Sequence, residues 1–234
     1  MTNNDFLNAV CNSFEEFLKS GTSRSTKKLK PLHGAIAKDI AERLGDGYTV
    51  VSQGWDGDKE EEMQGRYINK KVDITVMKND KAVAGIGVKF VMQNYSQNSN
   101  NYFENMLGET ANIRANNHPY FQVFIIFDKL PHYDKSKNIN AWETITIHNI
   151  EKYKTLSQDN IETFFHTPNK LLMYVVHIPD NENLKTSKEY LDYYKNKKFK
   201  MTLSSSVVNA FGSGVILNDY EEFASKVYHS IMAI

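Results

Sequence analysis

Residues 70–90 read KKVDITVMKNDKAVAGIGVKF and decide the fold of this chain. Over residues 70–77, apolar side chains alternate with polar ones, and this period of two is typical of a β-strand with one buried face. The turn-forming pair at 79–80 follows, and then a long second strand at 82–92. The stretch is therefore predicted to be a β-hairpin.

The alternation assigns the hairpin side chains to two faces. Asp73 lies opposite the apolar set of the first strand, and Lys89 shares a face with Gly85 and Gly87 on the second. If the apolar faces pack against helices, Asp73 and Lys89 emerge together on the other side. Such a pair can bind Mg²⁺, which prefers oxygen ligands, and can orient or deprotonate a nucleophilic water. The alternative is a salt bridge from Asp73 to Lys71 or Lys89, because an unpaired buried carboxylate is costly.

The rest of the chain supplies helices and further strands. Apolar spacing predicts helices at 4–19, at 32–44 and at about 101–115, and residues 120–127, YFQVFIIF, form a strand that is apolar on both faces. Further strands are expected at 48–52, 144–148 and 171–177, and further helices near 158–166 and from 219 to the end. The expected loops are 53–65, with room for a helical turn at 59–64, a polar connector at 93–101 and a loop around Pro131. This order predicts an α/β fold with a mixed central β-sheet flanked by helices, in a single domain over 1–234.

The composition is that of a chain that folds around a core. Hydrophobic residues make up 41% and charged residues 24% of the 234 positions. No stretch approaches the ~18 uninterrupted apolar residues that a membrane span needs, and the first residues lack the pattern of a signal peptide. Cys11, the single cysteine, can form neither an internal disulfide nor a cysteine-rich zinc site. We expect a cytoplasmic protein without a membrane partner.

Basic residues are balanced by acidic ones, 28 against 28, so the chain is no polycation. Binding of a nucleic acid would instead depend on local basic clusters. One such cluster holds Arg24, Lys27 and Lys28, between the first two predicted helices. These three residues are candidate contacts to DNA phosphates, and a solvated basic loop is the alternative.

The connector at 93–101 reads QNYSQNSNN and begins soon after Lys89. Asn and Gln side chains pair bidentately with adenine edges, and Ser and Asn contact phosphates. An ordinary polar loop is the alternative. The candidate DNA-binding residues in this connector are Asn94, Ser96, Gln97, Asn98 and Asn100.

The ordered set of hairpin residues resembles the PD-(D/E)XK nuclease superfamily, particularly its type II restriction-endonuclease-like members. That family has a helix–three-strand–helix–strand core, with an aspartate on the second strand and an acid-x-lysine triplet on the third. The resemblance implies a restriction-endonuclease-like core at about 32–130 and a C-terminal elaboration at 131–234. In it, Asp73 corresponds to the family aspartate and Lys89 to the lysine.

Two positions depart from the family pattern. Val72 replaces the proline of the family name, and Gly87 stands where the second acid belongs. Some restriction enzymes of this superfamily carry that acid on the following helix. Glu104 and Glu109 flank the apolar stripe of this helix on opposite edges, so only one is expected to reach the site, and we favour Glu104.

Glu42 and Glu62 are alternates for the second metal-binding acid. Several family members carry a metal-binding glutamate on the early helix, where Glu42 lies, and Glu62 precedes the aspartate strand. For Glu42 and Glu62, a solvated surface carboxylate is the alternative. The metal pair favoured by the sequence is thus Asp73 with Glu104.

The resemblance implies a Mg²⁺-dependent, site-specific endonuclease that cuts double-stranded DNA, as type II restriction enzymes do. A homodimer is expected, because two identical sites across a two-fold axis would cut both strands of a palindrome. The alternative is a catalytically inactive nuclease-fold protein for DNA binding or assembly, for which Gly87 is the best argument.

Overall fold

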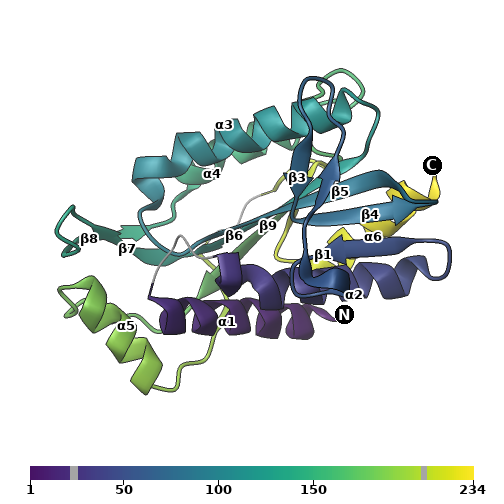
Figure 1. Ribbon diagram of the computed structural model, residues 1–234. Coiled ribbons are helices and arrows are strands. Elements are labelled where there is room, and N and C mark those ends of the chain that lie inside the picture. Colours follow the sequence, from purple (N-terminus) through teal and green to yellow (C-terminus); the bar gives the residue numbers. More distant parts are fainter. Residues whose placement is uncertain (22–25, 207–209) are drawn as a thin grey trace.

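A mixed β-sheet runs through the middle of the computed structural model, which describes residues 1–21, 26–206 and 210–234 (Figure 1). Within those residues the sheet has seven strands, in the order β1-β4-β5-β6-β9-β10, with β11 also paired to β9. The first three are antiparallel neighbours, whereas β5, β6 and β9 are parallel. The strands are β1 (Thr49–Ser52), β4 (Ile74–Lys78), β5 (Lys81–Val91), β6 (Tyr120–Phe127), β9 (Lys170–His177), β10 (Thr202–Leu203) and β11 (Val215–Leu217).

Helices cover both faces of this sheet, which makes the fold α/β with a mixed central sheet, as predicted (Figure 1). Helices α1, α2 and α6 lie on one face, and α3 and α4 lie on the other, while α5 packs beside α1. The helices are α1 (Asn3–Ser20), α2 (Lys30–Leu44), α3 (Tyr95–Arg114), α4 (Ile147–Leu156), α5 (Ser187–Asn196) and α6 (Tyr220–Met232), with short 3₁₀ turns at Thr26–Leu29 and Asp56–Asp58.

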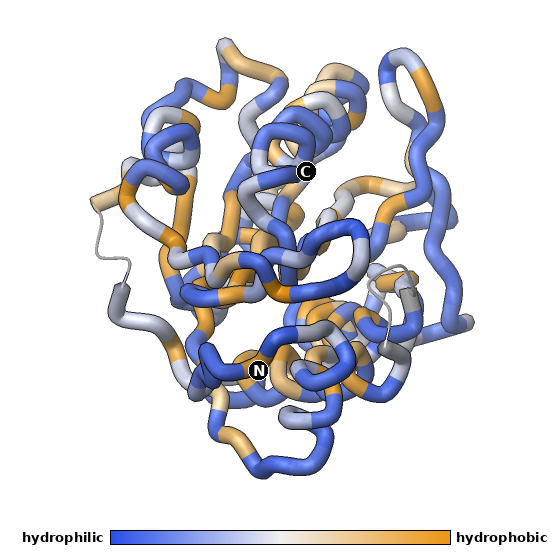
Figure 2. The backbone as a smooth tube through the Cα atoms, turned by 90° about the vertical axis from the view of Figure 1, so that its left-hand side faces the viewer, coloured by the Kyte–Doolittle hydropathy of each residue, from blue (hydrophilic) through white to orange (hydrophobic). Residues whose placement is uncertain are grey.

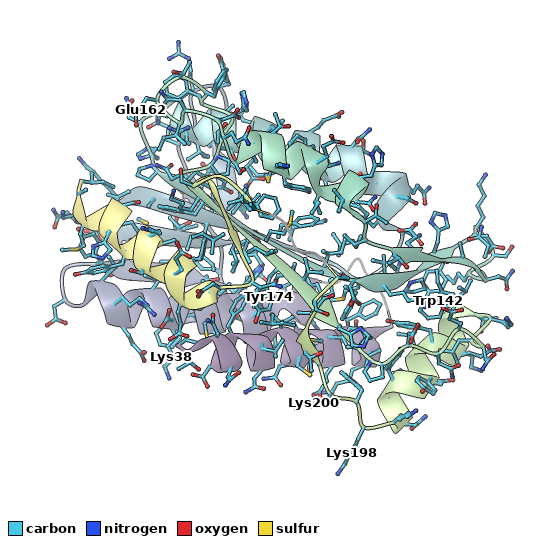
Figure 3. The ribbon with its side chains drawn as sticks, turned by 180° about the vertical axis from the view of Figure 1, so that it is seen from behind. Lys38, Trp142, Glu162, Tyr174, Lys198 and Lys200 are labelled. Atoms are coloured by element: carbon cyan, nitrogen blue, oxygen red, sulfur yellow. The ribbon has the colours of Figure 1, made fainter. Side chains whose placement is uncertain are left out.

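Strand β6 is the centre of the core, and all of its residues are buried. Its Phe127 ring meets Phe14 of α1 at 4.9 Å between centroids, and its Phe124 ring meets Tyr153 of α4 at 5.4 Å. On the neighbouring strand, Tyr174 lies in the middle of the molecule (Figure 3). Hydrophobic stretches gather where the sheet meets the helices, and hydrophilic stretches dominate the periphery (Figure 2). A strand with apolar side chains on both faces is therefore buried by two helical layers.

The predicted first hairpin strand is interrupted at Asp73. Its first part, β3 (Lys70–Val72), leaves the main sheet and pairs with β2 (Glu61–Met63), where the sequence suggested a loop with a helical turn. The carboxylate of Asp73 accepts the N–H of Val88 at 2.7 Å, so at this position the backbone of β5 bonds to a side chain and not to a neighbouring strand. The base of the β2–β3 hairpin instead packs on the sheet, where Met63 and Val72 are buried with Tyr120 of β6 and Ile113 of α3, and its loop lies beside α3 (Figure 1).

The prediction of a polar connector at 93–101 is wrong, because α3 begins at Tyr95 and includes most of this stretch. Asn94 adopts a left-handed conformation with φ 52° and accepts the N–H of Tyr133 through its side chain. Glu143 accepts the N–H of Ser96 at 3.0 Å and so caps the first turn of the helix. Both capping contacts come from residues distant in sequence.

Three more predictions are wrong: the loop around Pro131, the strand at 144–148 and the helix at 158–166. A second hairpin, β7 (Lys129–Tyr133) and β8 (Ile139–Thr144), extends toward α5 (Figure 3). Thr146 and Asn149 then form a capping box that starts α4. After α4, the guanidinium of Arg114 donates to the backbone carbonyls of Ile161, Phe164 and Thr167. These bonds hold residues 161–167 in turns and not in a helix. The sequence likewise did not predict α5.

Helix α2 packs closely on the loop after β1 through two glycines. A Cβ atom on Gly34 would lie 2.3 Å from the carbonyl oxygen of Gly54, which is far inside van der Waals contact. We expect Gly34→Ala to lower the free energy of unfolding by about 1–3 kcal/mol, because the two backbones must separate. Urea denaturation measures this change.

Gly108 is the matched control, since a Cβ atom there would meet nothing within 4 Å in the described residues. Gly108→Ala should raise the stability by about 0.5–1 kcal/mol, because glycine weakens a helix interior. Equal stabilities for wild type and Gly34→Ala would contradict the close packing of α2.

Candidate active site

A cleft of about 540 Å³ lies where α3 faces the β4–β5 hairpin and β6. It is lined by Asp73, Lys89 and Glu104, the three residues favoured from the sequence, and also by the alternate Glu109. Both helix glutamates line the cleft, although the sequence analysis expected only one of them to reach the site easily. The structure thus brings two strand residues and two acids of the following helix to one place.

Asp73 is half-buried at the point where the chain leaves β3 and enters β4. Burial raises the pKa of its carboxyl above the ordinary value of 3.8, although the N–H of Val88 and the charges of Lys70 and Lys89 oppose this rise. No ion pair within 4.0 Å joins Asp73 to Lys71 or Lys89 across the described ranges. The salt-bridge alternative is therefore not observed, and the carboxylate faces the cleft.

Lys89 projects from β5 into the same cleft and remains exposed to solvent. Its ammonium nitrogen lies 4.4 Å from the ring centroid of Tyr102 on α3, within the range of a cation–π interaction. Partial desolvation lowers the pKa of Lys89, and the negative charge of Asp73 opposes that shift. Lys89 therefore lies near Asp73 without forming a direct ion pair with it.

The space beside Gly87 is filled from the neighbouring strand. A Cβ atom on Gly87 would lie 2.8 Å from the hydroxyl of Tyr120 and 2.8 Å from the carboxamide oxygen of Gln122, both on β6. Gly87 and Gln122 are register partners in the parallel pair, so their side chains share a face. An acid at position 87 would collide with this pair, which gives a physical reason for the glycine.

Tyr120 and Gln122 are site residues that the sequence analysis missed. The available signal was the polar Gln122 within the otherwise apolar YFQVFIIF, in a strand expected to be buried on both faces. An uncharged polar side chain at such a position needs a partner or a role.

Glu109 is the helix acid on which the charge of Asp73 acts. Its carboxylate accepts the hydroxyl of the fully buried Tyr120 at 2.5 Å and lies 3.7 Å from the ammonium of Lys70. Burial raises the pKa of Glu109; Tyr120 and Lys70 lower it, and repulsion by Asp73 raises it further. Two carboxyls whose pKa values are raised, first of all by burial, therefore line the same cleft.

The remaining candidate acids are placed differently. Glu104 is exposed, and its charge acts on Lys152 of α4. Glu42 lies 3.8 Å from Lys38 on the exposed side of α2, and Glu62 accepts the side-chain amide of Asn69. Neither Glu42 nor Glu62 lines the cleft.

The predicted basic cluster is only partly within the described ranges. Arg24 lies outside the described residues, and Lys27 is exposed. Lys28 is buried, and burial together with the charge of Lys89 lowers its pKa to about 8. A hollow of about 210 Å³ is lined by Lys28, Lys89, Asn94 and other residues at the end of β5. It shares Lys89 and Tyr102 with the cleft, so the two spaces adjoin.

The polar residues predicted to contact DNA form the first turns of α3. Gln97 and Asn100 are exposed, while Asn98 donates to the backbone carbonyl of Asn94 at 3.1 Å. The hydroxyl of Ser96 donates to Glu143 at 2.5 Å. Asn94, Ser96 and Asn98 thus make hydrogen bonds within the protein at the start of α3, and Gln97 and Asn100 are exposed.

The donor set of the cleft fits Mg²⁺. Among the residues that the structure describes, no three His, Cys, Asp or Glu side chains gather as a complete metal site. Mg²⁺, however, commonly takes only one or two carboxylates from a protein and completes its shell with water and substrate phosphates. Asp73, Glu109 and the carboxamide of Gln122 supply oxygens in one cleft, where burial raises the pKa of both carboxyls and the charge of Asp73 raises that of Glu109 further.

The raised pKa of Glu109 has a consequence for stability. Between the unfolded and folded pKa values, the folded protein holds a proton that the unfolded chain has released, so stability falls as the pH rises through this window. Glu109→Gln keeps an oxygen for Tyr120 and removes the charge. We expect it to stabilise the metal-free protein more at about pH 8 than at about pH 5, by about 1.4 kcal/mol per unit of pKa shift.

Thermal unfolding in the presence of a chelator measures this difference. Glu104→Gln is the control, since this exposed side chain should leave the pH dependence unchanged. A stabilisation by Glu109→Gln that does not vary with pH would contradict the assigned shift.

Comparison of the chain with protein-family models, with curated proteins and with solved structures finds no match in any of the three. In the described ranges, none of the helices combines the length and the apolar character needed to cross a membrane. The chemistry of the cleft is therefore the basis for assigning a function.

Proposed function

We propose that this protein is a Mg²⁺-dependent, site-specific endonuclease that hydrolyses phosphodiester bonds of double-stranded DNA, as type II restriction enzymes do. The observation that carries the proposal is the convergence of Asp73, Lys89 and Glu109 on one cleft. Two acids and a lysine are the groups that metal-assisted phosphodiester hydrolysis requires: ligands for the cation and a partner for the attacking water.

The order of elements supports a restriction-endonuclease-like core. Helix α2 is followed by β1, β4 and β5, then by the crossover helix α3 and the parallel strand β6. This is the helix–three-strand–helix–strand order of the nuclease superfamily that the hairpin residues resemble. Asp73 precedes the second of these main-sheet strands, and Lys89 lies on the third.

Each residue of the cleft has a distinct role in the proposal. Asp73 and Glu109 hold the cation, and Gln122 offers a carboxamide oxygen in the space beside Gly87. Bound Mg²⁺ would act as a Lewis acid toward the phosphate and lower the pKa of a bound water. The hydroxyl of Tyr120 fixes the orientation of Glu109.

Lys89 is proposed to orient the attacking water and to accept its proton. The lowered pKa of this lysine favours that role, because less free energy is needed to present a neutral amine. Lys28 lies in the adjoining hollow, where it suits the phosphate next along the strand. A homodimer would place two such sites on the two strands of a palindrome.

Cleavage of plasmid DNA in the presence of Mg²⁺ tests the proposal. Wild type should give discrete bands, and Asp73→Asn should reduce the rate by about a thousandfold, equivalent to about 4 kcal/mol, because a metal ligand loses its charge. Lys89→Ala should also stop cleavage. Both variants should still bind DNA when Ca²⁺ replaces Mg²⁺, as measured by fluorescence anisotropy.

Cleavage by Asp73→Asn within about tenfold of wild type would refute the metal assignment. DNA binding by wild type without any cleavage would instead favour the inactive, DNA-binding alternative, for which the glycine at position 87 is the specific observation.

The two helix glutamates are separated by a matched pair of variants. Glu109→Gln should reduce cleavage by about a hundredfold or more, since it removes the charge of a proposed metal ligand. Glu104→Gln removes an exposed charge from the same cleft and should leave the rate within about tenfold of wild type. The reverse result would assign the second metal ligand to Glu104.

A further inference from the structure

The loop at the end of the β2–β3 hairpin, residues 64–69, is named the hairpin tip here. It presents two adjacent large apolar side chains to solvent, Tyr67 with 78% and Ile68 with 65% of its surface exposed. A single exposed apolar residue is ordinary, but two at the end of a projecting hairpin are typical of a contact surface. Figure 1 shows the end of this hairpin beside α3.

The hairpin tip is held in one conformation by α3. The side chain of Asn112 accepts the N–H groups of Tyr67 and Ile68 at 3.0 and 3.3 Å and donates to the carbonyl of Ile68 at 2.8 Å. A Cβ atom on Gly65 would lie 2.0 Å from the amide nitrogen of Asn112, so the contact is tight. The apolar side chains are thus preorganised, which lowers the entropy that a partner must overcome on binding.

The charge of this segment favours a polyanion as the partner. Residues 64–71 read QGRYINKK and contain Arg66, Lys70 and Lys71 but no acid, although Lys70 lies 3.7 Å from Glu109 and Glu62 of β2 is the register partner of Lys71. The guanidinium of Arg66 lies 5.8 Å from the ring centroid of Tyr67. Cations beside exposed apolar and aromatic groups suit duplex DNA, because the phosphates meet the cations and the grooves accept the apolar groups.

The hairpin tip is also continuous with the cleft. Ile68 and Lys70 line the same space as Asp73 and Lys89. Strand β3 leads directly from the tip to Asp73. A DNA strand whose phosphate lies at Asp73 would therefore pass the tip within the same complex.

We propose that the hairpin tip enters a groove of the DNA substrate beside the scissile phosphate. Tyr67 and Ile68 contact the bases or sugars within the groove, and Arg66 contacts a flanking phosphate. This inference rests on the proposed endonuclease function and adds to it a surface that recognises the duplex.

Fluorescence anisotropy of the full chain with labelled fragments of the plasmid used for cleavage, in Ca²⁺, tests this surface. The double variant Tyr67→Ala/Ile68→Ala should bind about tenfold more weakly or worse, with the salt dependence unchanged, because apolar contacts release no counterions. Arg66→Gln should lower the slope of log affinity against log salt by about one, as expected for a lost phosphate contact.

Ile234→Ala is the matched control. Its side chain is 62% exposed, close to the value for Ile68, and it follows α6 on the opposite face of the sheet. This variant should bind DNA as wild type does.

The outcomes separate this inference from the proposed function. Binding by the double variant within about twofold of wild type would overturn the role of the hairpin tip and leave the endonuclease proposal intact. Absence of DNA binding by wild type would overturn both. If the double variant instead converts a dimer to a monomer in sedimentation, the hairpin tip is a self-association surface and the groove contact is refuted.

Discussion

The hydrogen bond from the N–H of Val88 to the carboxylate of Asp73 determines both the path of the chain and the position of the acid. The side chain of Asp73 bonds to β5 at the position where strand pairing between β4 and β5 would otherwise continue. At this point β3 separates from β4 and pairs with β2 outside the main sheet. The bond also fixes one oxygen of a carboxylate whose burial opposes its charge. The projecting hairpin and the acid at its base are thus consequences of the same local geometry.

Crowding between neighbouring strands explains the glycine at position 87. Strands β5 and β6 are parallel and in register, and Gly87 faces Gln122 on the side toward α3. The hydroxyl of Tyr120 and the carboxamide of Gln122 occupy the space that a side chain at position 87 would need. Tyr120 in turn donates to Glu109, so the strand residue that excludes an acid from β5 holds one on α3. The glycine and the helix acid therefore belong to one packing arrangement.

Patterns that depend on neighbouring residues could be predicted from the sequence, and contacts from distant residues could not. Alternation located the β4–β5 hairpin, and continuous apolar character located β6, because each follows from burial of a face. The start of α3 was missed because its cap is Glu143, far along the chain. In the cleft, Asp73 and Lys89 could be paired by strand period alone, whereas the choice between helix acids depends on Tyr120, a partner that no helical wheel contains.

The two carboxyls of the cleft are held together by the fold rather than by attraction. Burial raises the pKa of both Asp73 and Glu109, and the charges of Lys70 and Lys89 partly offset this rise at Asp73 without forming ion pairs to it. Burial of two acids lowers the stability of the folded protein at neutral pH, and packing of α3 over β6 must sustain it. Since α3 also fixes the hairpin tip through Asn112, the same helix that carries Glu109 into the cleft presents the surface proposed to meet the substrate.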